Sequence, residues 1–448
     1  MPRLFGTDGI RGVANVDLRP PLAYALGRAA AAELLGGTRP MVVGQDTRRS
    51  GHMLVAALVA GATSVGADVH RLGVCPTPAL AFVTASGPFG AGVMVSASHN
   101  PAQDNGLKVI DSRGLKLDDR LEDELEALIW RSEELPSPGN DGVGREVDAS
   151  TLLVGYVEHR TRLAQRIGSS LRVALDCANG SGGAVAPSII GAAVQSVDVS
   201  FDAPDGVNIN RGCGATAPEA LAAIVAKGGV DVGFCLDGDA DRCVAIDERG
   251  AVVDGDQLIG IIALDRLERD ALAESTVVVS VLSNGGLVSA IEAAGGRVVR
   301  TPVGDKHIFD AMFVSGAGLG GEKSGHVIVM EHTASGDGIV TALEVLSILA
   351  RSGRPLSELA ARITLFPQQQ RTIPVRHKEG WEADRLLSAA VREAEAELSG
   401  RGRVVVRPSG TESALRIMIE GDDEARIVEL ADQLSALATQ RLDGERLD

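Results

Sequence analysis

Short apolar runs alternate with longer segments of helical periodicity along most of the chain. The runs at 41–44, 89–96, 173–176 and 277–280 consist mainly of apolar and small residues and predict buried strands. Three successive regions share one order, in which a strand, a helical segment and a second strand lead into a polar loop. Since this alternation is typical of α/β proteins, we expect an α/β fold with three similar mixed-sheet domains.

The C-terminal part of the chain follows a different order. Positions 381–398 and 424–442 show the periodicity of amphipathic helices, and 403–407 and 415–419 predict two strands with a loop between them. This segment therefore predicts a fourth unit whose layout differs from that of the first three.

Polar stretches rich in glycine and proline separate these units. Residues 132–148 lack periodicity and precede a helical segment at 152–167. A turn at 247–251 precedes a new helix at 256–267, and the chain becomes more charged after 366–371. The predicted domains are 1–150, 151–250, 251–367 and 368–448.

The charge balance restricts the class of ligand. The chain of 448 residues carries a net charge of −17 and has a pI near 5.0, which argues against binding to a nucleic-acid backbone. A phosphorylated ligand would have to lie in a local cationic pocket. We therefore expect a small phosphorylated substrate and no nucleic-acid partner.

The cysteines and the apolar runs bear on the compartment. The five cysteines are widely spaced and form no metal-type pair, which is typical of buried thiols in a reducing compartment. The first residues contain no apolar signal core, and no apolar run is long enough to cross a bilayer. We expect a cytoplasmic protein without a membrane partner.

Candidate chemistry begins with Ser98, which lies in the polar loop after the apolar strand at 89–96. His99, Asn100 and Pro101 follow it and turn the chain at the strand end, where α/β folds keep their catalytic groups. A hydroxyl at this place can act as a nucleophile. Taken alone, Ser98 is more often a turn serine that satisfies nearby backbone groups, so the interpretation depends on the other loops.

Asp237, Asp239 and Asp241 alternate along a second loop, directly after the apolar strand at 232–236. Their carboxylates can converge on one hard cation, and oxygen ligands of this kind suit Mg²⁺. The alternative is a solvated acidic turn. Three carboxylates leave coordination positions open, and a phosphate on Ser98 can fill one, so Ser98 and the three aspartates form one predicted metal site.

A third loop, at 407–412, joins the last two strands and combines groups that suit a phosphate dianion. Arg416 can add a second positive charge, whereas the alternative is a hairpin turn with a surface arginine. The candidates for phosphate binding are Arg407, Ser409, Gly410, Thr411 and Arg416.

A fourth polar loop offers a carboxylate and a hydroxyl, from Glu322 and Ser324, which can hydrogen-bond the vicinal hydroxyls of a sugar. The cationic and imidazole groups of Arg11, Lys108 and His326 can polarise a transferring phosphate or move a proton. Each of these residues, taken by itself, is more often a surface or structural residue.

These loops, in this order, resemble those of the α-D-phosphohexomutases, and the resemblance spans essentially the whole chain. Segment 5–12, Phe-Gly-Thr-Asp-Gly-Ile-Arg-Gly, resembles the amino-terminal motif of the phosphoglucosamine branch of the family. The resemblance implies three related α/β domains and a fourth, TATA-binding-protein-like α+β domain around a central cleft. It also implies a homodimer.

The resemblance further implies a magnesium-dependent isomerase. Phosphorylated Ser98 would transfer its phosphoryl group to glucosamine-6-phosphate. The resulting glucosamine-1,6-bisphosphate, both intermediate and activator, would reorient and return its other phosphate to Ser98. Glucosamine-1-phosphate would then leave for UDP-N-acetylglucosamine and peptidoglycan precursor synthesis. One Mg²⁺ would lie between phosphorylated Ser98 and the three aspartates.

The same resemblance assigns the remaining loops. Glu322 and Ser324 would hold sugar hydroxyls, and the loop at 407–411 would bind the non-reacting phosphate. Lys306 and His307 occupy a segment that helps to select the sugar, and His307 departs from the aromatic residue expected there. The alternatives are a phosphomannomutase or phosphoglucomutase, a non-catalytic phosphosugar sensor, and a serine phosphatase.

Overall fold

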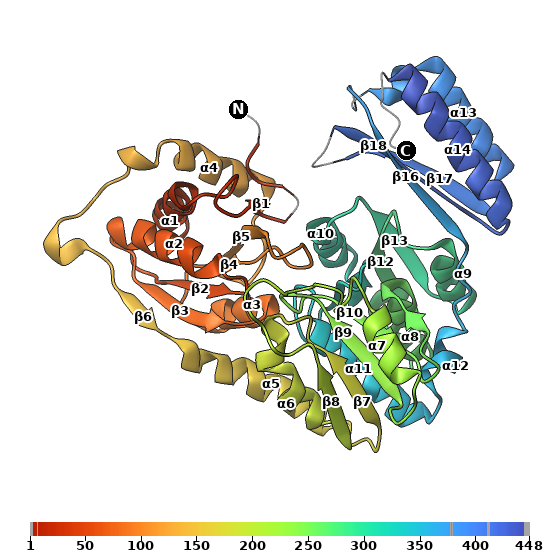
Figure 1. Ribbon diagram of the computed structural model, residues 1–448, viewed down its shortest axis with the longest axis horizontal. Helices are drawn as coiled ribbons and strands as arrows, with labels where there is room; N and C mark the ends of the chain where they lie inside the picture. Colours follow the sequence, from red (N-terminus) through yellow and green to blue (C-terminus); the bar gives the residue numbers. More distant parts are fainter. Residues whose placement is uncertain (1–2, 7, 377, 379, 410–412, 443–448) are drawn as a thin grey trace.

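Four β-sheets, each formed by a separate stretch of chain, organise the described part of the molecule (Figure 1). The structure is a computed structural model, and it describes every residue except 1–2, 7, 377, 379, 410–412 and 443–448. The first three sheets mix parallel and antiparallel pairs, and the fourth is antiparallel. The prediction of three mixed α/β units followed by an α+β unit is confirmed.

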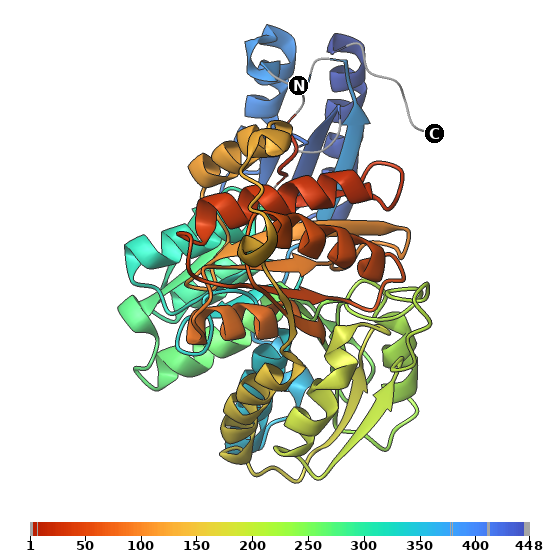
Figure 2. The ribbon, with the colours of Figure 1, turned by 90° about the vertical axis from the view of Figure 1, so that its left-hand side faces the viewer.

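The first sheet has the strand order β1-β5-β4-β2-β3-β6. Helices α1, α2 and α4 cover one face and α3 covers the other, so that β2 and β4 are buried on both faces (Figure 2). This burial explains why both strands are apolar along their length. The elements are β1 (Ile10–Val13), α1 (Pro20–Leu34), β2 (Met41–Gln45), α2 (Gly51–Ser64), β3 (Val69–Val74), α3 (Thr77–Ser86), β4 (Ala91–Val95), β5 (Asp104–Asp111), α4 (Asp119–Trp130) and β6 (Glu146–Asp148).

The second and third sheets repeat this plan with fewer strands. Their orders are β11-β10-β9-β7-β8 and β13-β12-β14-β15. The second unit contains α5 (Leu153–Gln165), β7 (Arg172–Asp176), α6 (Ala186–Gly191), β8 (Ser196–Ser200), α7 (Glu219–Val225), β9 (Val232–Leu236), β10 (Cys243–Ile246) and β11 (Val252–Val253). The third contains α8 (Gly255–Glu268), β12 (Thr276–Ser280), α9 (Gly285–Ala293), β13 (Arg297–Thr301), α10 (Asp305–Ser315), β14 (Leu319–Gly321), β15 (Val327–Val329), α11 (Gly338–Ser352) and α12 (Leu356–Ala360).

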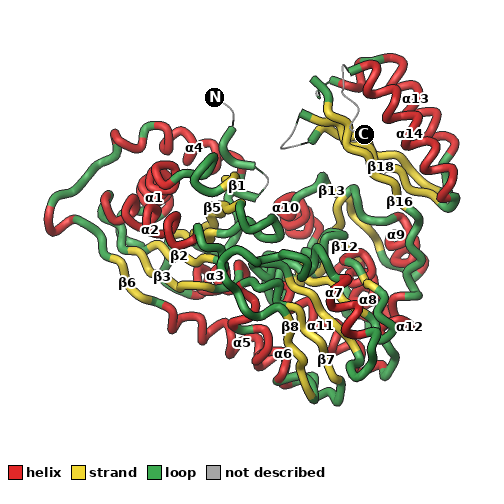
Figure 3. The backbone as a smooth tube through the Cα atoms, in the orientation of Figure 1, coloured by secondary structure: helices red, strands yellow, loops and turns green. Residues whose placement is uncertain are grey.

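Each of the first three sheets places one loop at the same topological position. A buried strand is followed by an antiparallel neighbour in the pairs β4–β5, β9–β10 and β14–β15. The turns of these pairs hold Ser98, the three aspartates and segment 322–326, respectively. Figure 3 shows loops gathered where the three sheets approach one another. The repeat predicted from the hydrophobic pattern is therefore also a repeat of the structure.

The fourth sheet has the order β16-β18-β17, with helices α13 and α14 packed on one face (Figure 1). The sequence predicts β17 and β18 but not β16, whose glutamine-rich start has no apolar pattern. β16 is a half-exposed edge strand, and its main-chain pairing with β18 does not depend on apolar side chains. The elements are β16 (Gln368–Pro374), α13 (Arg385–Glu397), β17 (Gly402–Pro408), β18 (Ala414–Gly421) and α14 (Glu424–Arg441).

Two features of the described residues concern the compartment. All five cysteines are buried as free thiols, as expected for core residues. Among the described helices, none is long enough and apolar enough to cross a membrane.

A buried carboxylate connects the fourth sheet to the third unit. Glu420 of β18 accepts hydrogen bonds from the Gly285 amide at the start of α9 (3.0 Å) and from Arg403 Nε (2.5 Å). Its second oxygen accepts from Gln368 Nε2 at 2.7 Å. The Arg403 guanidinium also donates to carbonyl oxygens of the loop at 281–283. Both charged groups therefore hold the two units together.

Replacement of Glu420 by alanine should loosen this junction. The change leaves Arg403 without its carboxylate partner, and we expect a loss of about 2 kcal/mol of stability. This figure lies below the usual range for a broken buried pair because the Arg403 side chain stays 20% exposed. Calorimetry should show a transition lowered by several degrees. Glu424→Ala, an exposed site in the first turn of α14, is the matched control, and equal shifts for both variants would contradict the prediction.

Candidate active site

The backbone of Ser98 is held in a conformation that non-glycine residues rarely adopt. Ser98 follows the end of β4, is buried, and has φ of +51°. Its amide donates to Ser96 Oγ at 2.9 Å, while its carbonyl oxygen accepts from Arg48 Nη2 (2.9 Å) and Asn210 Nδ2 (2.8 Å). A strained backbone of this kind costs on the order of 1–3 kcal/mol and persists only where its surroundings impose it. These three bonds impose it here.

Arg48 forms the centre of the serine loop. Its guanidinium is fully buried and paired with Asp46 at 2.8 Å. The remaining N–H groups donate to the carbonyl oxygens of Asn100 (2.8 Å) and Asp104 (2.9 Å) and to that of Pro101. Burial raises the pKa of Asp46, and Arg48 opposes this effect. The loop is therefore shaped around one planar cation that satisfies several carbonyls at once.

The three predicted aspartates converge. Asp237, Asp239 and Asp241 follow β9, are buried, and offer carboxylate oxygens that lie within 4.8 Å of one another. Ser98 Oγ donates to Asp237 Oδ2 at 2.5 Å. Burial and the two neighbouring carboxylates raise the pKa of Asp237 well above its ordinary value. The structure thus brings the serine loop and the acidic loop together.

Lys108 of β5 balances part of this negative charge. Its Nζ lies 2.8 Å from Asp239 Oδ2, 3.1 Å from Asp8 Oδ2 and 3.7 Å from Asp241 Oδ2. Burial alone would lower the pKa of Lys108, but these carboxylates raise it above its ordinary value. For Asp241, burial alone would raise the pKa. The positive charges of Lys108 and His326 outweigh this effect, so the pKa of Asp241 lies well below the usual range. Lys108 therefore remains an ammonium ion.

His326 and Arg11 complete the surroundings of the acidic loop. His326 Nδ1 lies 3.7 Å from Asp241 Oδ2, and its Nε2 lies 3.5 Å from Asp305 Oδ2. Burial would lower the pKa of His326, but the two carboxylates raise it. Arg11 pairs with Asp8 and also lies 3.4 Å from Asn100 Oδ1 of the serine loop.

The sequence patterns do not predict several charged residues that lie at this junction. Asp8 and Asp305 share the ammonium group of Lys116, which ties the first unit to the third. Arg242 closes the acidic loop, 3.9 Å from Asp241 Oδ1. Asp8 lies within the motif at 5–12 and Arg242 directly follows the aspartates, so adjacency to a motif is the signal that could have found both.

The predicted sugar residues have varied surroundings. Glu322 Oε1 accepts from the Gly304 amide at 3.1 Å, and the buried Ser324 Oγ has no hydrogen-bond partner among the described residues. Lys306 Nζ points to the first unit, 2.7 Å from Asp119 Oδ1 of α4, and His307 is exposed. The structure therefore does not bring Lys306 to the acidic loop.

The predicted phosphate residues lie at the turn between β17 and β18. Arg407 and Arg416 are directly opposite each other on these antiparallel strands. Burial and Arg416 lower the pKa of Arg407, and Glu322 of the third unit opposes them. Ser409 Oγ is buried without a hydrogen-bond partner among the described residues, while Gly410 and Thr411 lie outside them. The pair therefore brings two positive charges together on adjacent strands.

The acidic loop fits a metal ion. Oδ1 of Asp239 and Oδ1 of Asp241 are buried and accept no hydrogen bond from the described residues. Buried oxygens of an ionised carboxylate are costly without a partner. A hard divalent cation with oxygen ligands would satisfy both.

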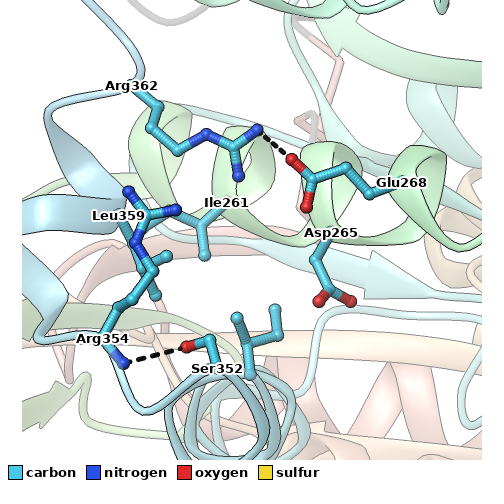
Figure 4. A pocket seen from close by; sticks show the side chains of 8 residues that line it. Ile261, Asp265, Glu268, Ser352, Arg354, Leu359 and Arg362 are labelled. Atoms are coloured by element: carbon cyan, nitrogen blue, oxygen red, sulfur yellow. Dashed lines mark hydrogen bonds and ion pairs between the residues drawn. The ribbon is translucent and has the colours of Figure 1, made fainter.

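A separate concavity, between α8 and the end of α11, does not serve as a sugar site. Its volume is about 40 Å³, far below the roughly 300–1,000 Å³ of typical ligand pockets. Figure 4 shows the Arg362–Glu268 ion pair across it, with Ile261 and Leu359 beside it. The concavity is a gap in helix packing and lies apart from the acidic loop.

Models of one protein family match four successive segments of the chain. Models of phosphoglucomutase/phosphomannomutase domains I, II, III and IV match residues 2–136, 154–250, 254–366 and 372–437. The chain belongs to the phosphoglucomutase/phosphomannomutase family. Membership confirms the resemblance that the loops predict, and the four matched segments each contain one of the four sheets or most of it.

Relatives in this family include enzymes with high identity over the full chain. The phosphoglucosamine mutase of Symbiobacterium thermophilum is 48% identical over 99% of this chain and 100% of its own. That of Moorella thermoacetica is 48% identical over 98% of this chain and 100% of its own.

Solved structures share the fold at lower identity. A phosphoglucomutase/phosphomannomutase family protein from Burkholderia thailandensis superposes with a TM-score of 0.81 at 24% identity, over 98% of this chain and 97% of its own. An Aspergillus fumigatus N-acetylphosphoglucosamine mutase in complex with GlcNAc-6P and magnesium gives a TM-score of 0.69 at 21% identity, over 98% and 95% of the two chains.

For this family member we predict an unusually acidic titration of His99, beside Ser98. Burial, with help from Arg242 and Arg11, lowers the pKa of His99 from 6.5 to about 4. Between pH 6.5 and about 4, His99 carries a proton in the unfolded chain but not in the folded chain. The free energy of unfolding should therefore fall as the pH drops from about 6.5 to about 4. NMR of labelled histidines, with His99→Gln for assignment, measures this value. Titration of His99 near pH 6.5 would refute the prediction.

Proposed function

We propose that the chain interconverts glucosamine-6-phosphate and glucosamine-1-phosphate by way of a phosphorylated Ser98. The observation that carries the proposal is the 2.5 Å contact between Ser98 Oγ and Asp237 within the buried acidic loop. This contact supports the proposal because a hydroxyl that could act as a nucleophile lies beside three carboxylates that could hold a divalent cation. The choice of sugar is supported by relatives of 42–48% identity that are named phosphoglucosamine mutase.

The proposed reaction consists of two phosphoryl transfers. In the first, the bond between Ser98 Oγ and phosphorus breaks while the C1 hydroxyl of glucosamine-6-phosphate loses its proton and bonds to phosphorus. In the second, glucosamine-1,6-bisphosphate has turned round. Ser98 Oγ, which took up a proton after the first transfer, loses it and bonds to the phosphorus of the 6-phosphoryl group, while the bond between that phosphorus and O6 breaks and O6 takes up a proton. Glucosamine-1-phosphate is released, and the enzyme is again phosphorylated. The bisphosphate is thus both the intermediate and the species that can phosphorylate a fresh enzyme.

The acidic loop is the proposed metal site. Asp237, Asp239 and Asp241, together with a phosphate on Ser98, would hold one Mg²⁺. When bound, the ion would supply positive charge that stabilises the transferring phosphoryl group. The Aspergillus fumigatus N-acetylphosphoglucosamine mutase structure is a complex with magnesium, which supports the choice of ion.

The remaining residues have proposed roles in binding and proton transfer. Lys108 and Arg11 would stabilise negative charge on the phosphoryl oxygens, and His326 is a candidate for moving the proton of the sugar hydroxyl. Glu322 and Ser324 would hold sugar hydroxyls.

The turn of the fourth sheet is the proposed site for the non-reacting phosphate. Arg407, Ser409 and Arg416 would hold this phosphate, and Gly410 and Thr411, which lie outside the described residues, are further predicted ligands. Lys306 and His307 stay candidates for sugar selection. A central cleft, the domain limits at 150, 250 and 367, a homodimer and a cytoplasmic location complete the proposal.

Replacement of Ser98 by alanine should abolish turnover. The variant loses the only group that carries the phosphoryl in this mechanism, while circular dichroism should show an intact fold. Incubation with glucosamine-1,6-bisphosphate should raise the mass of the wild-type protein by one phosphoryl group and leave the variant unchanged. Ser188→Ala, a remote serine at α6, is the control. Wild-type activity in Ser98→Ala would end the mechanism, and a wild type that accepts no phosphate would favour a phosphosugar sensor.

Competition between two sugars tests the proposed substrate. Phosphorus NMR of the wild type with Mg²⁺, a trace of bisphosphate and equal glucosamine-6-phosphate and glucose-6-phosphate reports relative specificity constants. We expect glucosamine-1-phosphate to form faster. Preferential glucose-1-phosphate would favour a phosphoglucomutase, the second candidate that the family supports. Net release of inorganic phosphate would favour a phosphatase.

A further inference from the structure

Thr77, at the start of α3, makes two hydrogen bonds to Asp239 of the acidic loop. Its Oγ1 donates to Asp239 Oδ2 at 2.6 Å, and its amide donates to the Asp239 carbonyl oxygen at 2.9 Å. Thr77 belongs to the first unit and Asp239 to the second. One residue therefore fixes both the backbone and the side chain of a candidate metal ligand across a domain junction.

The helix start explains why the two residues are held so close. The first amide groups of a helix have no partner within the helix. Thr77 is the first residue of α3, and the proline that follows it has no N–H group. The carbonyl of Asp239 satisfies the free amide of Thr77, which brings the threonine hydroxyl to the carboxylate.

The Thr77 hydroxyl gives the two carboxylate oxygens of Asp239 different surroundings. Oδ2 of Asp239 accepts from Thr77 and also from Lys108 Nζ, at 2.8 Å. Oδ1 is buried and accepts nothing from the described residues. With one oxygen held by two donors of the first unit, rotation of the carboxylate is prevented and the other oxygen is left for a ligand.

We propose that Thr77 is a positioning residue for the metal site: its hydroxyl orients Asp239 so that Oδ1 faces the bound ion. The inference rests on the proposed metal site and adds a residue that neither the sequence motifs nor the family match assigns. Hydrogen-bond partners of metal ligands commonly change metal affinity 10–100-fold when they are removed. A merely structural role for Thr77 would instead affect domain docking and leave metal affinity unchanged.

Metal affinity of the full-length, unphosphorylated protein tests the proposal without any measurement of turnover. Free Mn²⁺, counted by electron paramagnetic resonance during titration, reports the dissociation constant. Thr77→Val removes the hydroxyl at constant shape, Thr77→Ala removes it with less bulk in case valine does not fold, and Thr77→Ser restores it. Thr84→Val is the matched control, because Thr84 lies in the same helix and its buried hydroxyl donates only to the Leu80 carbonyl, at 2.7 Å.

We expect Thr77→Val and Thr77→Ala to weaken Mn²⁺ binding about tenfold or more, and Thr77→Ser and Thr84→Val to bind like the wild type. The rise in unfolding temperature that Mn²⁺ causes, measured for each variant against its own metal-free form, should be smaller without the hydroxyl at 77. Wild-type affinity in Thr77→Val and Thr77→Ala would overturn the role of Thr77 alone. A wild type that binds no Mn²⁺ would overturn the metal site as well.

Discussion

The repulsion between three buried carboxylates is the constraint on which the junction of the first three units depends. Asp237, Asp239 and Asp241 cannot remain close in a low-dielectric interior unless positive charge lies beside them. Among the described residues, Arg242 comes from their own unit, whereas Lys108 comes from the first unit and His326 from the third. The acidic loop is therefore complete only when the three units are assembled, so the charges that dock the units also shape the site.

The surroundings of Ser98 differ in rigidity from those of the paired Arg407 and Arg416. Ser98 is fixed by the fully buried Arg48 and by bonds to both sides of its peptide backbone, so its backbone has little freedom. The paired Arg407 and Arg416 belong to the fourth sheet, which joins the third unit through β16 and the Glu420 junction. The proposed nucleophile therefore lies in a closely packed loop, whereas the proposed phosphate site lies on a unit that joins the third through β16 and a buried ion pair.

Sequence patterns predict the elements and the loops well, because both depend on local order. Buried strands followed by polar turns identified Ser98 and the three aspartates, and the structure places them together. Thr77 and Arg48 were not predicted, since their partners lie far away in sequence and their own surroundings resemble ordinary helix starts and turns. β16 was missed for a related reason, because an edge strand held by main-chain bonds needs no apolar pattern.

A strongly acidic chain can bind a phosphorylated substrate because most of its charges act on the substrate only from a distance. The net charge of −17 is spread over the whole chain, and salt screens exposed charges beyond about 8 Å at physiological ionic strength. Within the site, Lys108 and Arg242 are partly or fully withdrawn from water, where each charge acts with less screening. The electrostatic potential within this site therefore depends on a few buried charges more than on the overall charge of the chain. The same low dielectric makes those cations indispensable to the aspartates when no substrate is bound.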